Sequence, residues 1–128
     1  MKLNLFLLPE TYGIYQVSKD NSIPNWIDKN YFNSITHTDE EISIVCKQTK
    51  DAIGYQSKFE NWRLLKVEGP LDFSQTGVIS NISEILNYQN VSVFIISTFN
   101  TDYIFIQKEQ LEEAVKAFDH HGYFIYDA

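Results

Sequence analysis

The sequence predicts an α+β protein in which an antiparallel sheet carries its helices on one face. Short apolar runs rich in β-branched residues alternate with two amphipathic segments, over residues 76–88 and 108–120. Each of these segments has a single apolar stripe, as expected of a helix that packs on one face of a sheet. A chain of 128 residues can bury about 65–70% of its unfolded surface, which is enough for a real core.

The first portion of the chain is expected to consist mainly of strands. Residues 3–8 form an apolar run that stops at Pro9 without the cleavage site of a signal peptide, so we interpret it as a strand. Three further runs have the aromatic and β-branched residues typical of strands. They cover residues 12–17, 32–36 and 42–46. Pro24 suits the first turn of a short helix, with Trp26 and Ile27 on its buried side.

Residues 47–61 are polar and show no sustained period, which indicates a boundary between two subdomains. We assign residues 1–58 to a truncated first unit, with residues 3–8 as its edge strand, and residues 59–128 to a complete second unit. The expected elements of the second unit are a strand, a helix, two strands, a helix and a strand. They cover residues 62–67, 76–88, 91–96, 103–106, 108–120 and 123–126. This βαββαβ order is the ferredoxin-like arrangement.

Charge and composition exclude several classes of partner. The net charge is −7, from ten basic and seventeen acidic residues, and the basic residues are scattered along the chain. Such a chain repels nucleic acid and anionic membrane surfaces. No apolar run approaches the roughly 20 residues of a membrane span. Cys46 is the only cysteine, which excludes an internal disulfide and indicates a reducing, cytoplasmic setting.

The sequence offers little for catalysis or metal binding. His120 and His121 are adjacent and would point about 100° apart on a helix, and His37 lacks the ligand spacing of known zinc sites. A nucleophile with a neighbouring base and a phosphate-binding glycine loop are both missing. We therefore expect no catalytic residue, no metal and no cofactor. A small enzyme stays an alternative, in which Asp102 or His37 would need a perturbed pKa.

Four segments carry a resemblance to a known family. They cover residues 41–46, 62–73, 76–78 and 96–103. Through them the chain resembles the tandem ACT-domain family, which is related to the regulatory domains of aspartate kinases and to the animal cytosolic arginine sensor. The resemblance implies two ferredoxin-like, ACT-type units side by side, with their antiparallel sheets joined and their helices on one face. It also implies that a ligand is held at the interface between ACT units.

The resemblance assigns the ligand site to particular residues of this chain. The second unit would contribute Asp72, Phe73, Gln75, Thr76, Gly77 and Val78, the first unit Ser43 and Ile44, and Asp102 would close the site. Exposed N–H groups at a helix start attract an α-carboxylate, and Asp102 would pair with the ligand ammonium. Gln75 stands where the resemblance places an acidic residue, so a cationic side chain is expected to bind less well.

Three of these residues also have a purely structural interpretation. Gly77 can be explained by close packing of the helix on a strand. Asp102 can be a turn or strand-start aspartate that bonds nearby groups. Ser43 can be the outward residue of an alternating strand. The sequence alone leaves both interpretations open.

The function that the sequence favours is a non-catalytic, cytoplasmic sensor or regulatory protein that binds an amino acid or a related small metabolite. The alternative is an interaction module whose groove is packed and holds no ligand. A homodimer is also expected, with Tyr123, Phe124 and Tyr126 as edge or interface residues.

Overall fold

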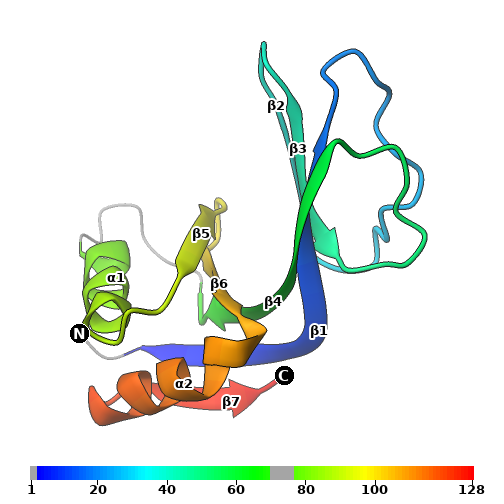
Figure 1. The fold of residues 1–128 in the computed structure, drawn as a ribbon. Helices are drawn as coiled ribbons and strands as arrows, with labels where there is room; N and C mark the ends of the chain where they lie inside the picture. Colours follow the sequence, from blue (N-terminus) through cyan, green and yellow to red (C-terminus); the bar gives the residue numbers. More distant parts are fainter. Residues whose placement is uncertain (1–2, 70–76) are drawn as a thin grey trace. The chain divides into compact units, whose positions relative to one another are not determined.

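The computed structural model describes residues 3–69 and 77–128, which belong to two compact units (Figure 1). The small unit consists of residues 10–61, and the large unit consists of residues 1–9 together with 62–128. The strands are β1 (Asn4–Val17), β2 (Asn33–His37), β3 (Ile42–Lys47), β4 (Ser57–Val67), β5 (Val93–Ser97), β6 (Asp102–Gln107) and β7 (Phe124–Asp127). The helices are α1 (Val78–Tyr88) and α2 (Leu111–His120), and the 3₁₀ turn Lys108–Gln110 leads into α2.

The large unit has the ferredoxin-like element order that the sequence predicts. From β4 onward its elements are strand, helix, two strands, helix and strand. The strand order in this unit is β7-β1-β4-β6-β5, and β6 pairs antiparallel with both β4 and β5. The α+β class and the antiparallel pairing of these three strands are confirmed.

The N-terminal strand corrects the assignment of residues 3–8 to the first unit. Residues Asn4 to Leu7 pair in parallel with Phe124 to Asp127 of β7, and the Glu68 N–H donates to the Asn4 carbonyl at 2.8 Å. Every second residue of this segment is apolar and packs into the core of the large unit, where Leu5 is fully buried. The segment therefore belongs with residues 62–128, and it adds a parallel strand pair that was not expected.

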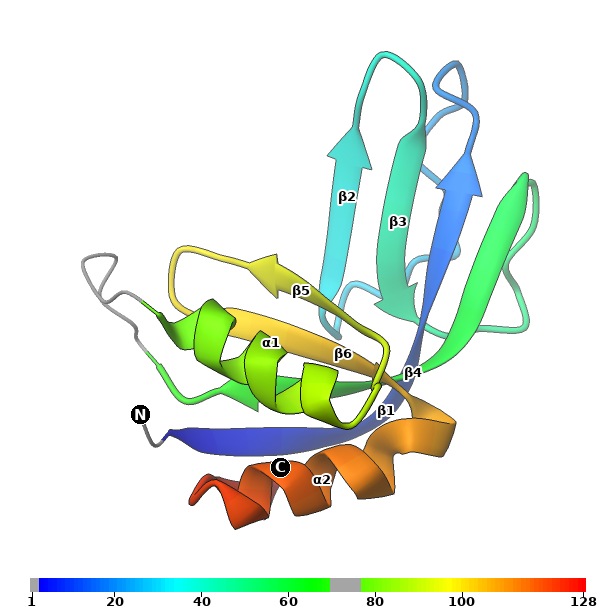
Figure 2. The ribbon, with the colours of Figure 1, turned by 60° about the vertical axis from the view of Figure 1, so that its left-hand side comes forward.

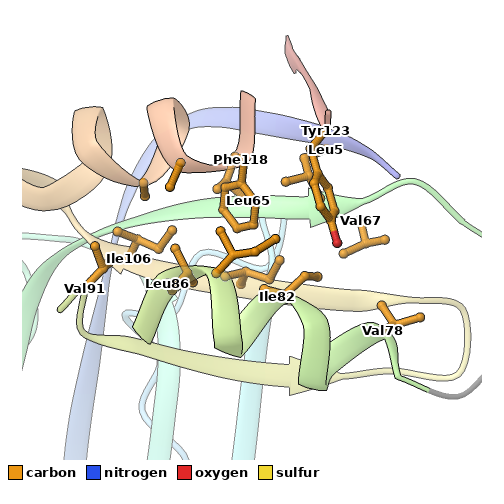
Figure 3. Packing of buried hydrophobic residues seen from close by; sticks show 14 residues of the cluster. Leu5, Leu65, Val67, Val78, Ile82, Leu86, Val91, Ile106, Phe118 and Tyr123 are labelled. Atoms are coloured by element: carbon orange, nitrogen blue, oxygen red, sulfur yellow. The ribbon is translucent and has the colours of Figure 1, made fainter. Parts of the chain in front are cut away.

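Both helices pack on the same face of the large unit's sheet (Figure 3). The buried residues of α1 and α2 belong to one hydrophobic cluster with alternate residues of the strands. The strand members are Leu5, Leu65, Val67, Ile104 and Ile106, and the helix members are Val78, Ile82, Ile85, Leu86, Ala114, Ala117 and Phe118. The hydroxyl of Tyr123 also donates to Asn81 of α1. Most of the expected apolar stripe of α1 is thus buried against the sheet, except Ile79, which is exposed. On α2, Phe118 is buried as expected, whereas Leu111 and Val115 are half-buried and Ala114 and Ala117 face the core instead.

The small unit is built from strands and turns, without a helix anywhere in residues 10–61. Residues Tyr12 to Val17 of β1 pair antiparallel with β3, which pairs antiparallel with β2. The expected helix at Pro24 is wrong. The Trp26 indole N–H donates to the Ile53 carbonyl at 3.0 Å, and the Asp28 carboxylate accepts the Asn30 N–H at 3.0 Å. These bonds favour turns over a helix, although Ile27 is buried as expected.

Tyr15 is the central aromatic residue of the small unit. It is fully buried, and its ring centroid lies 5.0 Å from that of Trp26 and 5.8 Å from that of Tyr55. Its hydroxyl donates to Glu60 Oε2 at 2.7 Å. A Cβ atom at Gly13 would lie 2.9 Å from two atoms of the Tyr15 side chain. Glycine at position 13 is therefore what allows the ring to cross the backbone of β1.

Gly13→Ala is expected to lower the free energy of unfolding by about 1–3 kcal/mol, because the added methyl group displaces a packed ring. Urea denaturation measures this change. The control is a double-mutant cycle with Tyr15→Leu, which lacks the ring atoms that the methyl group meets. An equal loss in both backgrounds would show that Tyr15 does not explain the glycine.

Candidate functional site

Within the part of the chain that the structure describes, no side chain caps the start of α1. Gly77 precedes the helix with φ 82° and ψ 0°, a left-handed conformation that glycine adopts without strain. The first backbone bond runs from the Asn81 N–H to the Gly77 carbonyl at 2.9 Å, so the N–H groups of residues 78–80 have no partner inside the helix. Gly77 has no side chain to cap them, and no acidic residue lies in the first turn. This end of α1 therefore attracts a negative group.

The loop between β5 and β6 lies at the same end of the large unit as the start of α1 (Figures 2 and 3). Within the loop, the Thr98 N–H donates to the Thr101 carbonyl at 2.9 Å. The buried Thr101 hydroxyl donates to the Val67 carbonyl, at the end of β4, at 2.7 Å. This hydrogen bond ties the loop to the strand that precedes α1. We call the α1 start and this loop together the helix-start site.

Asp102 is the first residue of β6, and its side chain is largely buried, with 8% exposure. Its Oδ1 accepts a hydrogen bond from the Ser97 hydroxyl at 2.6 Å, so the local structural role that the sequence allowed is present. Among the residues that the structure describes, none donates a hydrogen bond to Oδ2. Asp102 therefore supports the loop through one carboxylate oxygen.

The other predicted site residues fall into three groups. Asp72, Phe73, Gln75 and Thr76 lie outside the described residues. Gly77 and Val78 lie at the helix start, where Val78 points its side chain into the core. Ser43 and Ile44 lie on β3 of the small unit, where Ser43 is half-buried and Ile44 is fully buried in that unit's core.

The described residues offer few groups for other chemistry. Burial raises the pKa of the Cys46 thiol to about 11, so it stays protonated and a poor nucleophile at neutral pH. His37 is exposed at the end of β2. In residues 3–69 and 77–128, no group of three His, Cys, Asp or Glu side chains could hold a metal ion. No helix in these ranges is long and apolar enough to cross a membrane.

Comparison with known proteins supports the resemblance found in the sequence. Residues 59–119 match the sequence model of the ACT domain, and residues 10–53 match the model of an N-terminal domain. The large unit therefore combines a ferredoxin-like fold with the sequence pattern of an ACT domain, which confirms the ACT resemblance for residues 59–119.

Individual relatives agree with this assignment. The cytosolic arginine sensor for mTORC1 subunit 1 of Rattus norvegicus is 32% identical over 66 residues, which are 51% of this chain and 20% of that protein. The chain thus spans about a fifth of this curated relative. A crystal structure from Agrobacterium tumefaciens is 29% identical with a TM-score of 0.90, covering 100% of this chain and 95% of that one. The structure of Clostridium acetobutylicum aspartate kinase is 12% identical with a TM-score of 0.64, and the match covers 88% of this chain and 33% of that one.

Thr101, which anchors the loop of the candidate site, was not among the predicted site residues, although its place just before an apolar strand run was a usable signal. Thr101→Val keeps the shape of the side chain but leaves the Val67 carbonyl without this partner. The variant is expected to lose about 1–3 kcal/mol of unfolding free energy, measured by urea denaturation. Thr36→Val, the same change on the exposed face of β2, is the control and should be nearly neutral. Equal effects of the two changes would mean that the Thr101 bond does not stabilise the loop.

Proposed function

We propose that this protein is a non-catalytic regulatory module that binds an amino acid at the helix-start site. The single observation that carries the proposal is the open start of α1 at Gly77, located in a region that matches the ACT-domain model. The similarity to an arginine sensor and to an allosteric aspartate kinase supports a regulatory role. The cytoplasmic setting expected from the composition is part of the same proposal.

The charges of the helix-start site fit the backbone groups of an amino acid. The N–H groups of residues 78–80, which have no partner inside the helix, would bind the α-carboxylate, because the helix dipole and such donors both favour an anion. Asp102 Oδ2 would accept a hydrogen bond from the α-ammonium group. Because Asp102 is largely buried, a charged partner there would meet little competition from water. Both groups are common to all amino acids, so the side chain must be selected elsewhere.

A thermal-shift screen against the common amino acids tests the proposal. A ligand at 100 times its dissociation constant should add about 2.7 kcal/mol of stability, so one or a few amino acids should raise the melting temperature. A flat screen would contradict the proposal and favour the interaction module. Turnover of a ligand would contradict the non-catalytic role.

The interaction module is the second candidate because β7 carries two exposed aromatic residues. Phe124 is 63% exposed and Tyr126 is 47% exposed, and β7 pairs with β1 alone among the described strands. Aromatic residues on an unpaired strand edge favour association with another chain. A homodimer formed through this edge is the simplest form of this candidate. Light scattering of the parent and of Phe124→Ser compares their molar masses and so tests whether the dimer forms through this edge.

Asp102→Asn should weaken binding of any amino acid found in the screen by at least about tenfold, because the amide cannot provide a charge-assisted bond to the ammonium. The asparagine side chain keeps the shape of aspartate and can still accept the hydrogen bond from Ser97, so the melting temperature without ligand should change little. Calorimetry measures the affinity. Asp119→Asn, which removes the same charge from an exposed position on α2, is the control. Unchanged affinity in Asp102→Asn would show that the ligand binds elsewhere.

A neutral or small amino acid should bind more tightly than arginine. The reason is Gln75, which the resemblance places in the site and whose amide cannot form the charge-assisted bidentate bond of a carboxylate with a guanidinium group. Competition calorimetry with arginine and neutral amino acids measures the order of affinities. If arginine were the tightest ligand, this expectation would be contradicted. If the expectation is correct, Gln75→Glu should shift the preference toward arginine.

A further inference from the structure

The small unit has a pocket of about 570 Å³, a volume typical of small-molecule sites. It lies entirely within residues 10–61, so it is separate from the helix-start site. The side chains that matter for its chemistry are three lysines, a carboxylate and an aromatic residue. They are Lys47, Lys50, Lys58, Glu60 and Tyr55. None of them belongs to the amino-acid site proposed above.

The pocket gathers positive charge in an acidic protein. Three of the ten basic residues in a chain of net charge −7 line it. Lys58 Nζ lies 3.1 Å from Glu60 Oε1, so this lysine and the carboxylate neutralise each other. Lys47 and Lys50 have no carboxylate within ion-pair distance among the described residues. Two ammonium charges therefore stay unpaired beside the same pocket.

Two hydrogen bonds and a cation–π contact hold the walls of the pocket in place. The fully buried Tyr15 donates its hydroxyl to Glu60 Oε2 at 2.7 Å, which fixes the carboxylate that holds Lys58. The Lys47 ammonium lies 4.1 Å from the centroid of the Tyr31 ring. Gln48 Oε1 accepts the Asn61 N–H at 2.8 Å, which ties the turn after β3 to β4. The pocket is thus formed before any ligand binds.

We propose that this pocket binds the phosphate group of a small phosphorylated metabolite. A phosphate monoester carries a charge of about −1.5 to −2 at neutral pH, which matches two unpaired ammonium groups. Lysine binds phosphate as a point charge, and no arginine is among the described residues that line the pocket, so the ligand would be held by charge rather than by a bidentate guanidinium fork. Tyr55 and Ala52 provide an apolar wall for the body of the ligand.

Calorimetry at low ionic strength with the full chain tests the proposal, using phenyl phosphate, inorganic phosphate, phenol and succinate as probes. Phenyl phosphate should bind saturably, inorganic phosphate more weakly because it cannot contact Tyr55, and phenol not at all. Binding should weaken as salt is added, since exposed charges are screened. No saturation at millimolar phenyl phosphate would overturn the proposal. Succinate binding as tightly as phenyl phosphate would overturn the choice of phosphate.

Three variants separate a site from a general effect of charge. Lys50→Gln should weaken phenyl phosphate binding by about tenfold, whereas Lys19→Gln, an exposed lysine outside the pocket, should change it little. Glu60→Gln should tighten binding by about threefold, because it frees the Lys58 ammonium while its amide oxygen can still accept the Tyr15 hydroxyl. A variant that merely misfolds would not bind more tightly. Equal losses in Lys50→Gln and Lys19→Gln, or weaker binding in Glu60→Gln, would refute the proposal.

Discussion

Burial of one face of the large unit's sheet under α1 and α2 is the constraint on which the rest of that unit depends. Five residues of β1, β4 and β6 that face the helices are fully excluded from water: Leu5, Leu65, Val67, Ile104 and Ile106. Such burial is the main favourable term in folding. A shift of one residue in any of these strands would move these residues off the face that the helices cover. The register is therefore fixed, and with it the end of the sheet where β4 stops and α1 begins.

The same constraint explains which parts of the fold could be predicted from the sequence. The segments that became α1 and α2 have a clear helical period, and the one that became β5 is a short apolar run rich in β-branched residues, so their type follows from the pattern alone. Residues 3–8 also show a strand pattern, but such a pattern does not show which other strand the segment pairs with. Leu5 belongs to the helix-covered core, which only the assembled sheet reveals. The turn at Trp26 depends on a hydrogen bond to Ile53, far along the chain.

The two candidate sites differ in how far they could be predicted from the sequence. Gly77 and Asp102 were found through family motifs, although the burial of Asp102 and its bond with Ser97 came from the structure. The pocket lined by Lys47, Lys50 and Lys58 was not predicted from the sequence, because these residues lie in the polar segment 47–61, which has no hydrophobic period. Lys47 and Lys58 are brought to one pocket only by the folding of β3 and β4 around Tyr15. Polar segments without a pattern conceal such arrangements.

The large unit is discontinuous along the chain, and this has a consequence for its synthesis. Residues 10–61 separate β1's first residues from the rest of that unit, and the partner of those residues, β7, is the last strand in the sequence. During translation the small unit is complete before the large unit has its final strand. Leu5 can pack on β4 and α1 earlier, because β1 also neighbours β4. Only the pairing of residues 4–7 with β7 must wait until β7 leaves the ribosome, and such distant pairing slows folding.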